Sequence, residues 1–256
     1  IIVQAMGGIM SITGPEGGEP TRVGASVGDI IAGLFTTIGV SMALYHRAMT
    51  GEGQKIDVSM LDCQVAVLEN AISRYLVNGE IPGPIGNRHP SITPFEGFTA
   101  SDGYVIVGAG NDRLWKKLCD LLGKPELITD PRFVTNGDRT NNQKALKPIL
   151  DSVFKTKTID AWLVVLEEAG IPCAPINTVD RVLKDPQIKA RNMIVEVEHP
   201  VAGKMHIPGV PIKMSQTPGT VEKAAPLLGQ HTEEILSEML GYDNAKVQEL
   251  RDKGIL

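Results

Sequence analysis

One short segment places a carboxylate among small neighbours in a pattern that could support covalent chemistry. Ser26-Val27-Gly28-Asp29 opens a run of helical periodicity, so Asp29 is expected in the first turn of a helix. The positive end of the helix dipole favours the ionised form of a carboxylate there. Gly28, and then Ala32 and Gly33 one turn further on, leave space beside it. An ionised carboxylate in open surroundings can act as a nucleophile.

The same residues also match the pattern of a helix-capping box. In that arrangement the Ser26 side chain accepts a hydrogen bond from the backbone N–H of Asp29, and the Asp29 carboxylate accepts one from the backbone N–H of Ser26. Residue types alone leave the structural and the catalytic role open, and one side chain can serve both.

Acyl thioesters are a substrate class on which a carboxylate can act without a metal ion or a separate base. Attack by the ionised oxygen gives a mixed anhydride and releases a thiolate, which can then attack the aspartyl carbonyl to give an enzyme-bound thioester. Such a site needs donors for the developing oxyanion and exclusion of water, since hydrolysis would destroy each intermediate. A glycine-rich loop over Asp29 would meet both needs.

Two helical segments are expected to position Asp29. Apolar residues recur at helical spacing over 27–47 and again over 59–77, with a short strand at 55–58 between them. Glycine, threonine and serine interrupt the apolar stretch around 30–44. We therefore expect a buried helix that is too short and too mixed in composition to span a membrane.

The character of the chain changes twice, which predicts three regions. Residues 1–80 are expected to be part of a large domain that carries Asp29, residues 81–188 a small α+β domain with its linker, and residues 189–256 a return to the large domain. Proline and glycine crowd residues 81–94 and predict a loop there. Periodicity predicts strands at 104–107, 194–197 and 204–207, and helices at 113–122, 142–154, 158–169 and 232–240.

Composition limits the possible partners and compartments. The chain has 256 residues and a net charge of -5 without a basic cluster, which argues against a nucleic acid or an anionic membrane as partner. Cys63, Cys119 and Cys173 lack CxxC spacing, so we expect no disulfide framework, no metal site and a cytoplasmic location. The first residues contain neither an initiator methionine nor a signal-peptide pattern, so the sequence is expected to begin inside a longer polypeptide.

Short motifs in a fixed order carry a resemblance to a known family. The earlier ones are Gln4-Ala5-Met6-Gly7-Gly8, Ser26-Val27-Gly28-Asp29, Thr50-Gly51-Glu52-Gly53-Gln54 and Ile56-Asp57-Val58-Ser59-Met60. The later ones are Gly86-Asn87-Arg88-His89-Pro90, Asp130-Pro131-Arg132-Phe133, Ala169-Gly170-Ile171-Pro172-Cys173 and Leu227-Leu228-Gly229-Gln230-His231-Thr232. The ordered set resembles the class III CoA-transferases, the CaiB/BaiF-like family that includes formyl-CoA transferases.

The resemblance implies a fold and a site. The fold would be α/β, with a nucleotide-binding-like core in a large domain whose N-terminal part precedes this sequence, a smaller α+β domain, and an interlocked homodimer. Asp29 falls at the family's catalytic aspartate, and Gly86, Asn87, Arg88 and His89 fall at the glycine-rich loop that covers its intermediates. This loop holds one glycine where formyl-CoA transferases have a run. Coenzyme A would be a substrate rather than a permanently bound cofactor, and most residues that contact it would lie upstream of this sequence.

The substrates implied by the resemblance are an acyl-CoA and a carboxylic acid. Residues 4–16 and 107–111 look most like the branch that uses succinyl-CoA and a dicarboxylic acid such as glutarate. Arg88 or Arg22 could then pair with the second carboxylate, since a guanidinium binds a carboxylate through two parallel hydrogen bonds. A surface or interdomain salt bridge is the alternative for both arginines.

Two other functions remain open. The same superfamily includes α-methylacyl-CoA racemases, which need an acid at the position that aligns with Asn111. The amide of Asn111 cannot transfer a proton at neutral pH. The chain could also be a diverged assembly subunit that keeps the fold and performs no chemistry. Asp29 with its small neighbours favours the transferase over both alternatives.

Overall fold

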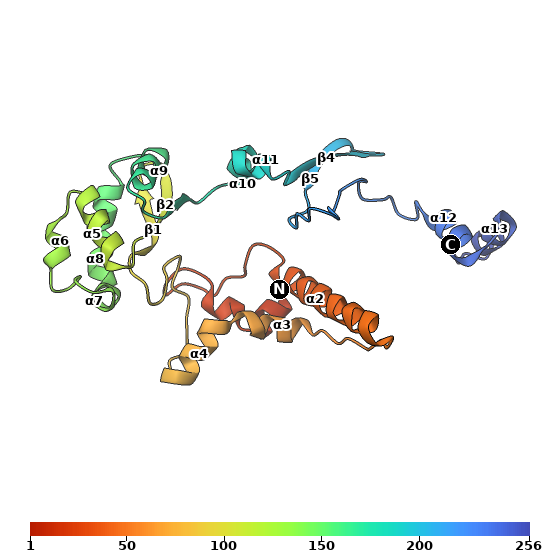
Figure 1. The fold of residues 1–256 in the computed structure, drawn as a ribbon, viewed down its shortest axis with the longest axis horizontal. Coiled ribbons are helices and arrows are strands. Elements are labelled where there is room, and N and C mark those ends of the chain that lie inside the picture. Colours follow the sequence, from red (N-terminus) through yellow and green to blue (C-terminus); the bar gives the residue numbers. More distant parts are fainter. The chain divides into compact units, whose positions relative to one another are not determined.

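A computed structural model describes every residue from Ile1 to Leu256. The chain divides into two compact units, Ile1–Ile176 and Asn177–Leu256. Helices and strands are both present, and every strand pair is antiparallel (Figure 1). The expected mixture of helix and sheet is thus confirmed, whereas the nucleotide-binding-like core, the boundaries near residues 80 and 188 and the interlocked dimer stay predictions.

The first unit opens with three helices: α1 (Ile2–Met6), the 3₁₀ helix η1 (Ile9–Ile12) and α2 (Val27–Thr50). Helix α2 begins where the sequence predicts and ends at Gly51, which adopts the left-handed conformation. Threonines do not interrupt it, because Thr36 and Thr37 each donate their hydroxyl to the carbonyl four residues earlier. The polar residues of this stretch are therefore compatible with one continuous helix.

The expectation of a short, buried helix is wrong for α2. The helix is 24 residues long and exposes apolar side chains along its length, among them Ile30, Leu34, Ile38 and Met42. Length and composition alone would allow it to cross a membrane, since an 18-residue window has a mean hydropathy of 1.7 and only 6% of that window is buried. The predicted range of 27–47 was close to the observed one, but the expected burial was wrong, because periodicity places apolar residues on a helix without showing what covers them. The threonines that seemed to break up the apolar stretch satisfy their hydroxyl groups within the helix.

The segment after α2 also departs from the predicted pattern. Residues 55–58 form no strand, and the helix predicted over 59–77 is divided into α3 (Met60–Val67) and α4 (Glu69–Asn78). The division lies at Glu69, whose φ of 21° is outside the helical region. Neither proline nor glycine marks this position, so periodicity alone predicted a continuous helix.

Helix α1 packs closely against the N-terminal end of α2. A Cβ atom on Gly28 would lie 2.7 Å from Val3 Cγ1, closer than real Cβ contacts. The two helices can therefore approach this closely only because residue 28 is glycine. Gln4 is buried at the same junction and accepts a hydrogen bond from the backbone N–H of Val23, 3.0 Å away. This bond fixes the chain that leads into α2.

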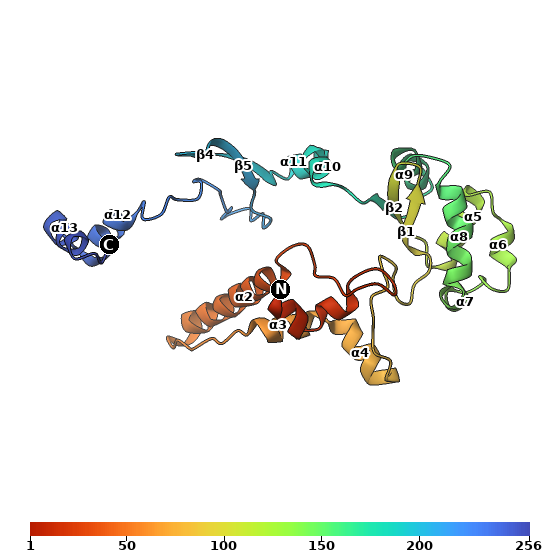
Figure 2. The same cartoon turned by 180° about the vertical axis from the view of Figure 1, so that it is seen from behind.

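The remainder of the first unit surrounds a sheet with the strand order β1-β2-β3. The strands are β1 (Phe95–Ala100), β2 (Gly103–Gly108) and β3 (Cys173–Pro175). The helices are α5 (Asp112–Leu121), α6 (Glu126–Thr129), α7 (Asn136–Asn141), α8 (Gln143–Phe154) and α9 (Ile159–Glu168). Helix α8 contacts β1, and α9 contacts β2 and β3, in the region that Figure 2 shows from behind. The predicted strand at 104–107, the three helices predicted in this region and the loop at 81–94 are confirmed.

Aromatic side chains dominate the core of this region. The largest completely buried apolar side chains are those of Trp115, Trp162, Phe98, Phe133 and Phe154. Trp162 donates its indole N–H to the Phe154 carbonyl at 2.6 Å, and the Phe154 ring stacks on Phe98 with centroids 4.7 Å apart. The core therefore buries large apolar surface without leaving the Trp162 donor unpaired.

A buried arginine joins the loops around this core. Arg139 of α7 has no exposed surface. Its guanidinium donates to four backbone carbonyls and one carboxylate, which belong to Thr93, Gly110, Phe133, Val134 and Asp112. A guanidinium carries five N–H donors, so these five acceptors can satisfy the whole group. Arg139 thereby fixes loops that are far apart in the sequence.

The second unit contains short helices and one hairpin. Its elements are α10 (Val179–Lys184), α11 (Pro186–Ala190), β4 (Ile194–His199), β5 (Gly203–Pro208), α12 (Thr232–Leu240) and α13 (Asn244–Asp252). Strands β4 and β5 pair antiparallel. The strands predicted at 194–197 and 204–207 and the helix predicted at 232–240 are confirmed.

Replacing Arg139 by methionine should strongly destabilise the first unit. The variant leaves buried carbonyls without donors, and we expect the free energy of unfolding to fall by about 3–5 kcal/mol. Urea denaturation followed by tryptophan fluorescence measures the change. Arg132→Met is the matched control, because the Arg132 side chain is exposed and forms its ion pair with nearby Asp130, while its guanidinium lies over the Phe133 ring. Equal denaturation midpoints for both variants would contradict the role of Arg139.

Substitution of two glycines of α2 should have opposite effects on stability. Gly28→Ala forces a Cβ against Val3, so we expect a loss of about 1–3 kcal/mol. Gly33→Ala meets no atom within 4 Å and should stabilise the helix by about 0.5–1 kcal/mol. Thermal unfolding followed by circular dichroism distinguishes the two. A Gly28→Ala protein as stable as the Gly33→Ala protein would refute the close packing of α1 on α2.

Candidate active site

Asp29 lies in the first turn of α2, as the sequence predicts, and its side chain is exposed. The alternative capping box is absent, since Ser26 is the N-cap residue but its side chain makes no cap hydrogen bond. The ψ of Ser26 is 59°, whereas Ser59, which does cap its helix, has an extended ψ of 130°. No hydrogen bond or ion pair occupies the Asp29 carboxylate, so it stays available at the positive end of the helix.

The small residues beside Asp29 have different roles. Gly33 lies one turn further along α2, and no heavy atom lies within 4 Å of the position that its Cβ would take. This part of the helix is therefore open to an approaching molecule. Gly28 is buried against Val3, so its lack of a side chain serves helix packing rather than access to Asp29.

The loop Gly86–His89 is anchored at its first two residues. Gly86 has a positive φ of 67° and donates its N–H to the Gly14 carbonyl at 2.9 Å. The Asn87 side chain accepts the backbone N–H of Gly97 at 3.2 Å and packs directly over that glycine. These bonds hold the loop between the segment that follows η1 and strand β1.

His89 is engaged by its own neighbours. Its backbone N–H donates to the Phe95 carbonyl at 2.9 Å, and its Nδ1 accepts the backbone N–H of Ser91 at 3.2 Å. The imidazole also stacks on the Phe95 ring, with centroids 5.6 Å apart and planes 4° apart. In this conformation, His89 therefore serves the local structure of its loop.

Arg88 points into a cluster of charged side chains that line a cavity of about 290 Å³. Its Nε lies 3.6 Å from Glu16 Oε2, and Lys144 Nζ lies 3.3 Å from Glu16 Oε1. The Arg88 Nε atom is buried and has no hydrogen-bond partner. Glu16 therefore stands between two cations without satisfying the Nε donor.

Glu96 forms a buried wall of the same cavity. Gln143 donates its Nε2 to both carboxylate oxygens, at 3.0 and 2.9 Å. Burial raises the pKa of Glu96 above its usual value, while the Gln143 hydrogen bond and the charges of Lys147 and Arg88 oppose that rise. Lys147 is itself bound to the Asp151 carboxylate at 2.7 Å. The cavity is thus built from interacting charges of both signs.

Arg22 differs from Arg88 in what its guanidinium contacts. Its Nη1 donates to the carbonyls of Val23 and Gly24, at 3.3 and 3.1 Å. These bonds stabilise the exposed loop before α2. Of the two arginines that the sequence suggested for a carboxylate, Arg88 lines a charged cavity, whereas Arg22 is bound to the carbonyls of its own loop.

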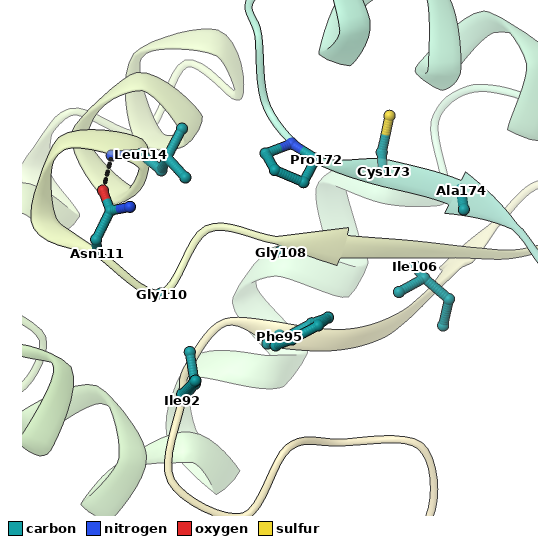
Figure 3. A pocket seen from close by; sticks show the side chains of 10 residues that line it. All are labelled: Ile92, Phe95, Ile106, Gly108, Gly110, Asn111, Leu114, Pro172, Cys173 and Ala174. Atoms are coloured by element: carbon teal, nitrogen blue, oxygen red, sulfur yellow. Dashed lines mark hydrogen bonds between the residues drawn. The ribbon is translucent and has the colours of Figure 1, made fainter. Parts of the chain in front are cut away.

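A second cavity, of about 530 Å³, lies along β2 and β3 and has a mainly apolar lining that includes Phe95, Ile106 and Pro172 (Figure 3). Asn111 lies at its edge and accepts the backbone N–H of Leu114 at 2.9 Å, which caps α5. The amide is thus used structurally at the position where a racemase would need an acid. This geometry argues against proton transfer in this cavity.

Two cysteines of this region are poor nucleophiles. Burial raises the pKa of the Cys119 thiol to about 12. Burial, together with the charge of Glu167, also raises the pKa of Cys173, which lines the apolar cavity. No group of three or more His, Cys, Asp or Glu side chains is placed to hold a metal ion. Asp29 therefore remains the exposed candidate nucleophile that the sequence indicated.

The structure links the loop to the chain leading into α2 rather than to Asp29 itself. The bonds from Gly86 to Gly14 and from Arg88 to Glu16 join the two segments, and no hydrogen bond or ion pair joins the loop to Asp29. The covering role of Gly86, Asn87, Arg88 and His89 stays a prediction. Sequence reasoning missed Glu16, Glu96 and Lys144, because no spacing signal connects residues that only folding brings together.

Comparison with known proteins defines the family. Residues 1–232 match the family described as CoA-transferase family III. The chain is 36% identical over 255 residues to the succinyl-CoA:glutarate CoA-transferase of Homo sapiens, covering 100% of this chain and 58% of that protein. It is 45% identical over 215 residues to the acetyl-CoA:oxalate CoA-transferase of Acetobacter aceti, covering 84% of this chain and 54% of that protein.

A solved structure has the same fold. The crystal structure of a CAIB/BAIF family protein from Brucella suis is similar with a TM-score of 0.80 and 39% sequence identity, over 93% of this chain and 61% of that one. The chain thus spans less than two thirds of the length of these relatives. The family match covers most of the residues, and the relatives share the sequence and the fold. The chain therefore belongs to CoA-transferase family III.

Proposed function

We propose that the protein transfers coenzyme A from an acyl-CoA thioester to a carboxylic acid, with Asp29 as the nucleophile. The observation that carries this proposal is the exposed, unpartnered Asp29 carboxylate at the N-terminal end of α2 in a chain of this family. The carboxylate lies at the positive end of the helix dipole, and Gly33 leaves the adjacent helix surface open.

The reaction proceeds by exchange of acyl groups on Asp29. One carboxylate oxygen bonds to the thioester carbonyl carbon, the C–S bond breaks, and coenzyme A leaves as a thiolate. The thiolate attacks the Asp29 carbonyl, which releases the donor acid as a carboxylate and leaves an aspartyl-CoA thioester. The acceptor carboxylate then attacks this thioester, and the thiolate finally attacks the acceptor carbonyl of the resulting anhydride, which regenerates Asp29. Every step forms one bond to a carbonyl carbon and breaks another at the same carbon, no oxidation state changes, and the chemistry requires no metal ion or bound cofactor.

The proposed acceptor is a dicarboxylic acid. Two relatives have names that specify glutarate and oxalate as acids and succinyl-CoA and acetyl-CoA as thioesters. The cavity around Arg88 and Lys144 offers positive charge suited to a carboxylate. We extend the family's loop role to Gly86–His89, which would exclude water from the Asp29 intermediates.

We further propose a cytoplasmic homodimer in which protein covers the exposed apolar side chains of α2. A contiguous apolar surface of this kind is typical of an interface. The relatives are longer than this chain, so additional sequence of the same protein is a further source of cover. Three free cysteines favour a reducing compartment.

Substitution of Asp29 should abolish transfer. In the full-length protein, Asp29→Ala is expected to lower the rate of transfer from succinyl-CoA by roughly 10³-fold or more, because no other group can form the covalent intermediate. Hydroxylamine trapping and peptide mass spectrometry should label Asp29 in the unaltered protein. Asp57→Asn is the control for an exposed carboxylate outside the site.

Three outcomes separate the candidate functions. Label on Asp29 with CoA transfer supports the proposal. Solvent exchange of the α-proton of a branched acyl-CoA without label would refute transfer and favour a racemase. A folded protein with neither signal would indicate a non-catalytic assembly subunit.

The dimer should depend on the apolar surface of α2. Light scattering during gel filtration should give twice the mass of one full-length chain. Ile38→Asp is expected to lower the dimer fraction because it places a charge on that surface, whereas Val164→Asp, at an exposed position of α9, should not. A monomeric unaltered protein would contradict the proposal.

A further inference from the structure

We propose that Arg88 and Lys144 bind the carboxylate of the acceptor that is not attacked in the reaction, and that Glu16 occupies this position while no acceptor is bound. The inference rests on the proposed CoA transfer and names the group that selects a dicarboxylic acid. The site is the cavity of about 290 Å³ between the loop Gly86–His89 and helix α8.

The Arg88 guanidinium has an N–H donor, on Nε, that no protein acceptor pairs with. Its Nε is buried without a hydrogen-bond partner, and Glu16 Oε2 is 3.6 Å away, which is longer than a hydrogen bond. A buried donor without an acceptor is unfavourable. A ligand carboxylate in the plane of the guanidinium could accept from Nε and from a second N–H, which is the usual geometry of such pairs.

Glu16 is held loosely enough to be replaced. Its side chain is 43% exposed, and that of Lys144 is 86% exposed. Both ion pairs of Glu16 are contacts of charge without a hydrogen bond, and exposed pairs of this kind contribute little to stability. Displacement of Glu16 by a ligand carboxylate exchanges one negative charge for another and adds the missing hydrogen bond on Arg88.

The charge around the cavity matches one carboxylate. Three cations and two carboxylates line it: Arg88, Lys144, Lys147, Glu16 and Glu96. A third carboxylate, that of Asp151, pairs with Lys147 from outside the lining. Withdrawal of Glu16 leaves one positive charge unmatched when Glu96 is ionised. One carboxylate restores the balance, whereas the phosphate groups of coenzyme A would overcompensate it. The cavity therefore suits the acceptor better than the CoA donor.

The position of Glu16 links this cavity to the chain that leads into α2. Glu16 lies in the loop that runs into α2, and Gly14, two residues before it, accepts the N–H of the first residue of the loop Gly86–His89. When an acceptor displaces Glu16, the contact between these two segments changes. Binding of a second carboxylate is thereby coupled to the loop that is proposed to cover the Asp29 intermediates.

The test compares glutarate with valerate, a monocarboxylic acid of the same chain length, as acceptors for the full-length protein. Arg88→Gln should raise KM for glutarate about 10- to 100-fold with little change in kcat, because the contact exists equally in the ground and transition states. KM for valerate should not change. Glu16→Gln should lower KM for glutarate several-fold, and Arg88→Lys should restore part of the affinity. Arg132→Gln, at an exposed arginine outside the cavity, is the matched control.

Binding is also measured without turnover. Glutarate, but not valerate, should protect Arg88 from phenylglyoxal, as read by peptide mass spectrometry. Protection of Arg88 without any CoA transfer would support the carboxylate site and refute the proposed reaction. Transfer without protection would overturn the site and leave the reaction intact. An equal rise of KM for both acids, or a raised KM for the CoA thioester alone, would also overturn the assignment.

Discussion

The buried guanidinium of Arg139 is the interaction on which the arrangement of the first unit's loops depends. It binds the Thr93 carbonyl where the proline-rich loop leads into β1, and the Gly110 carbonyl where β2 leads into α5. Burial of a charge is costly unless all its donors are paired, and here five acceptors converge on one group. The same group therefore positions the end of the segment that carries Arg88 and the start of the helix that Asn111 caps.

A second constraint acts on the catalytic candidate itself. Asp29 is presented by a helix whose first turn is pressed against α1, and this approach depends on the absence of a side chain at Gly28. Gln4, on α1, also holds the Val23 N–H just before α2 begins. Packing on one side of the helix end leaves the Asp29 side free. Gly28 makes the packing contact with α1, so the neighbouring Asp29 carboxylate can stay exposed.

Three carboxylates of this protein show how surroundings assign a role. Asp29 is exposed and unpaired, which suits a nucleophile. Glu16 stands between two cations that hold it only by charge, which suits a group that a ligand displaces. Glu96 is buried, and its desolvation raises its pKa while Gln143 bonds both oxygens. The same functional group therefore occurs as an exposed candidate nucleophile, as the occupant of a cavity and as part of the wall of that cavity.

The sequence by itself determined the family, the helix start at Val27 with Asp29 in its first turn, the loop at 81–94, the strand at 104–107 and the helices at 113–122, 142–154 and 158–169, because these follow from local periodicity, turn residues and ordered motifs. It did not predict β1, β3, α6 or α7. Only the tertiary structure decided the break at Glu69, the absence of the Ser26 cap and the exposure of α2. It also brought Glu16 to Arg88 and Lys144, which are distant in the chain. Local patterns report backbone preference within a few residues, whereas burial and ion pairing depend on which distant surfaces meet, and this information appears only when the chain is packed.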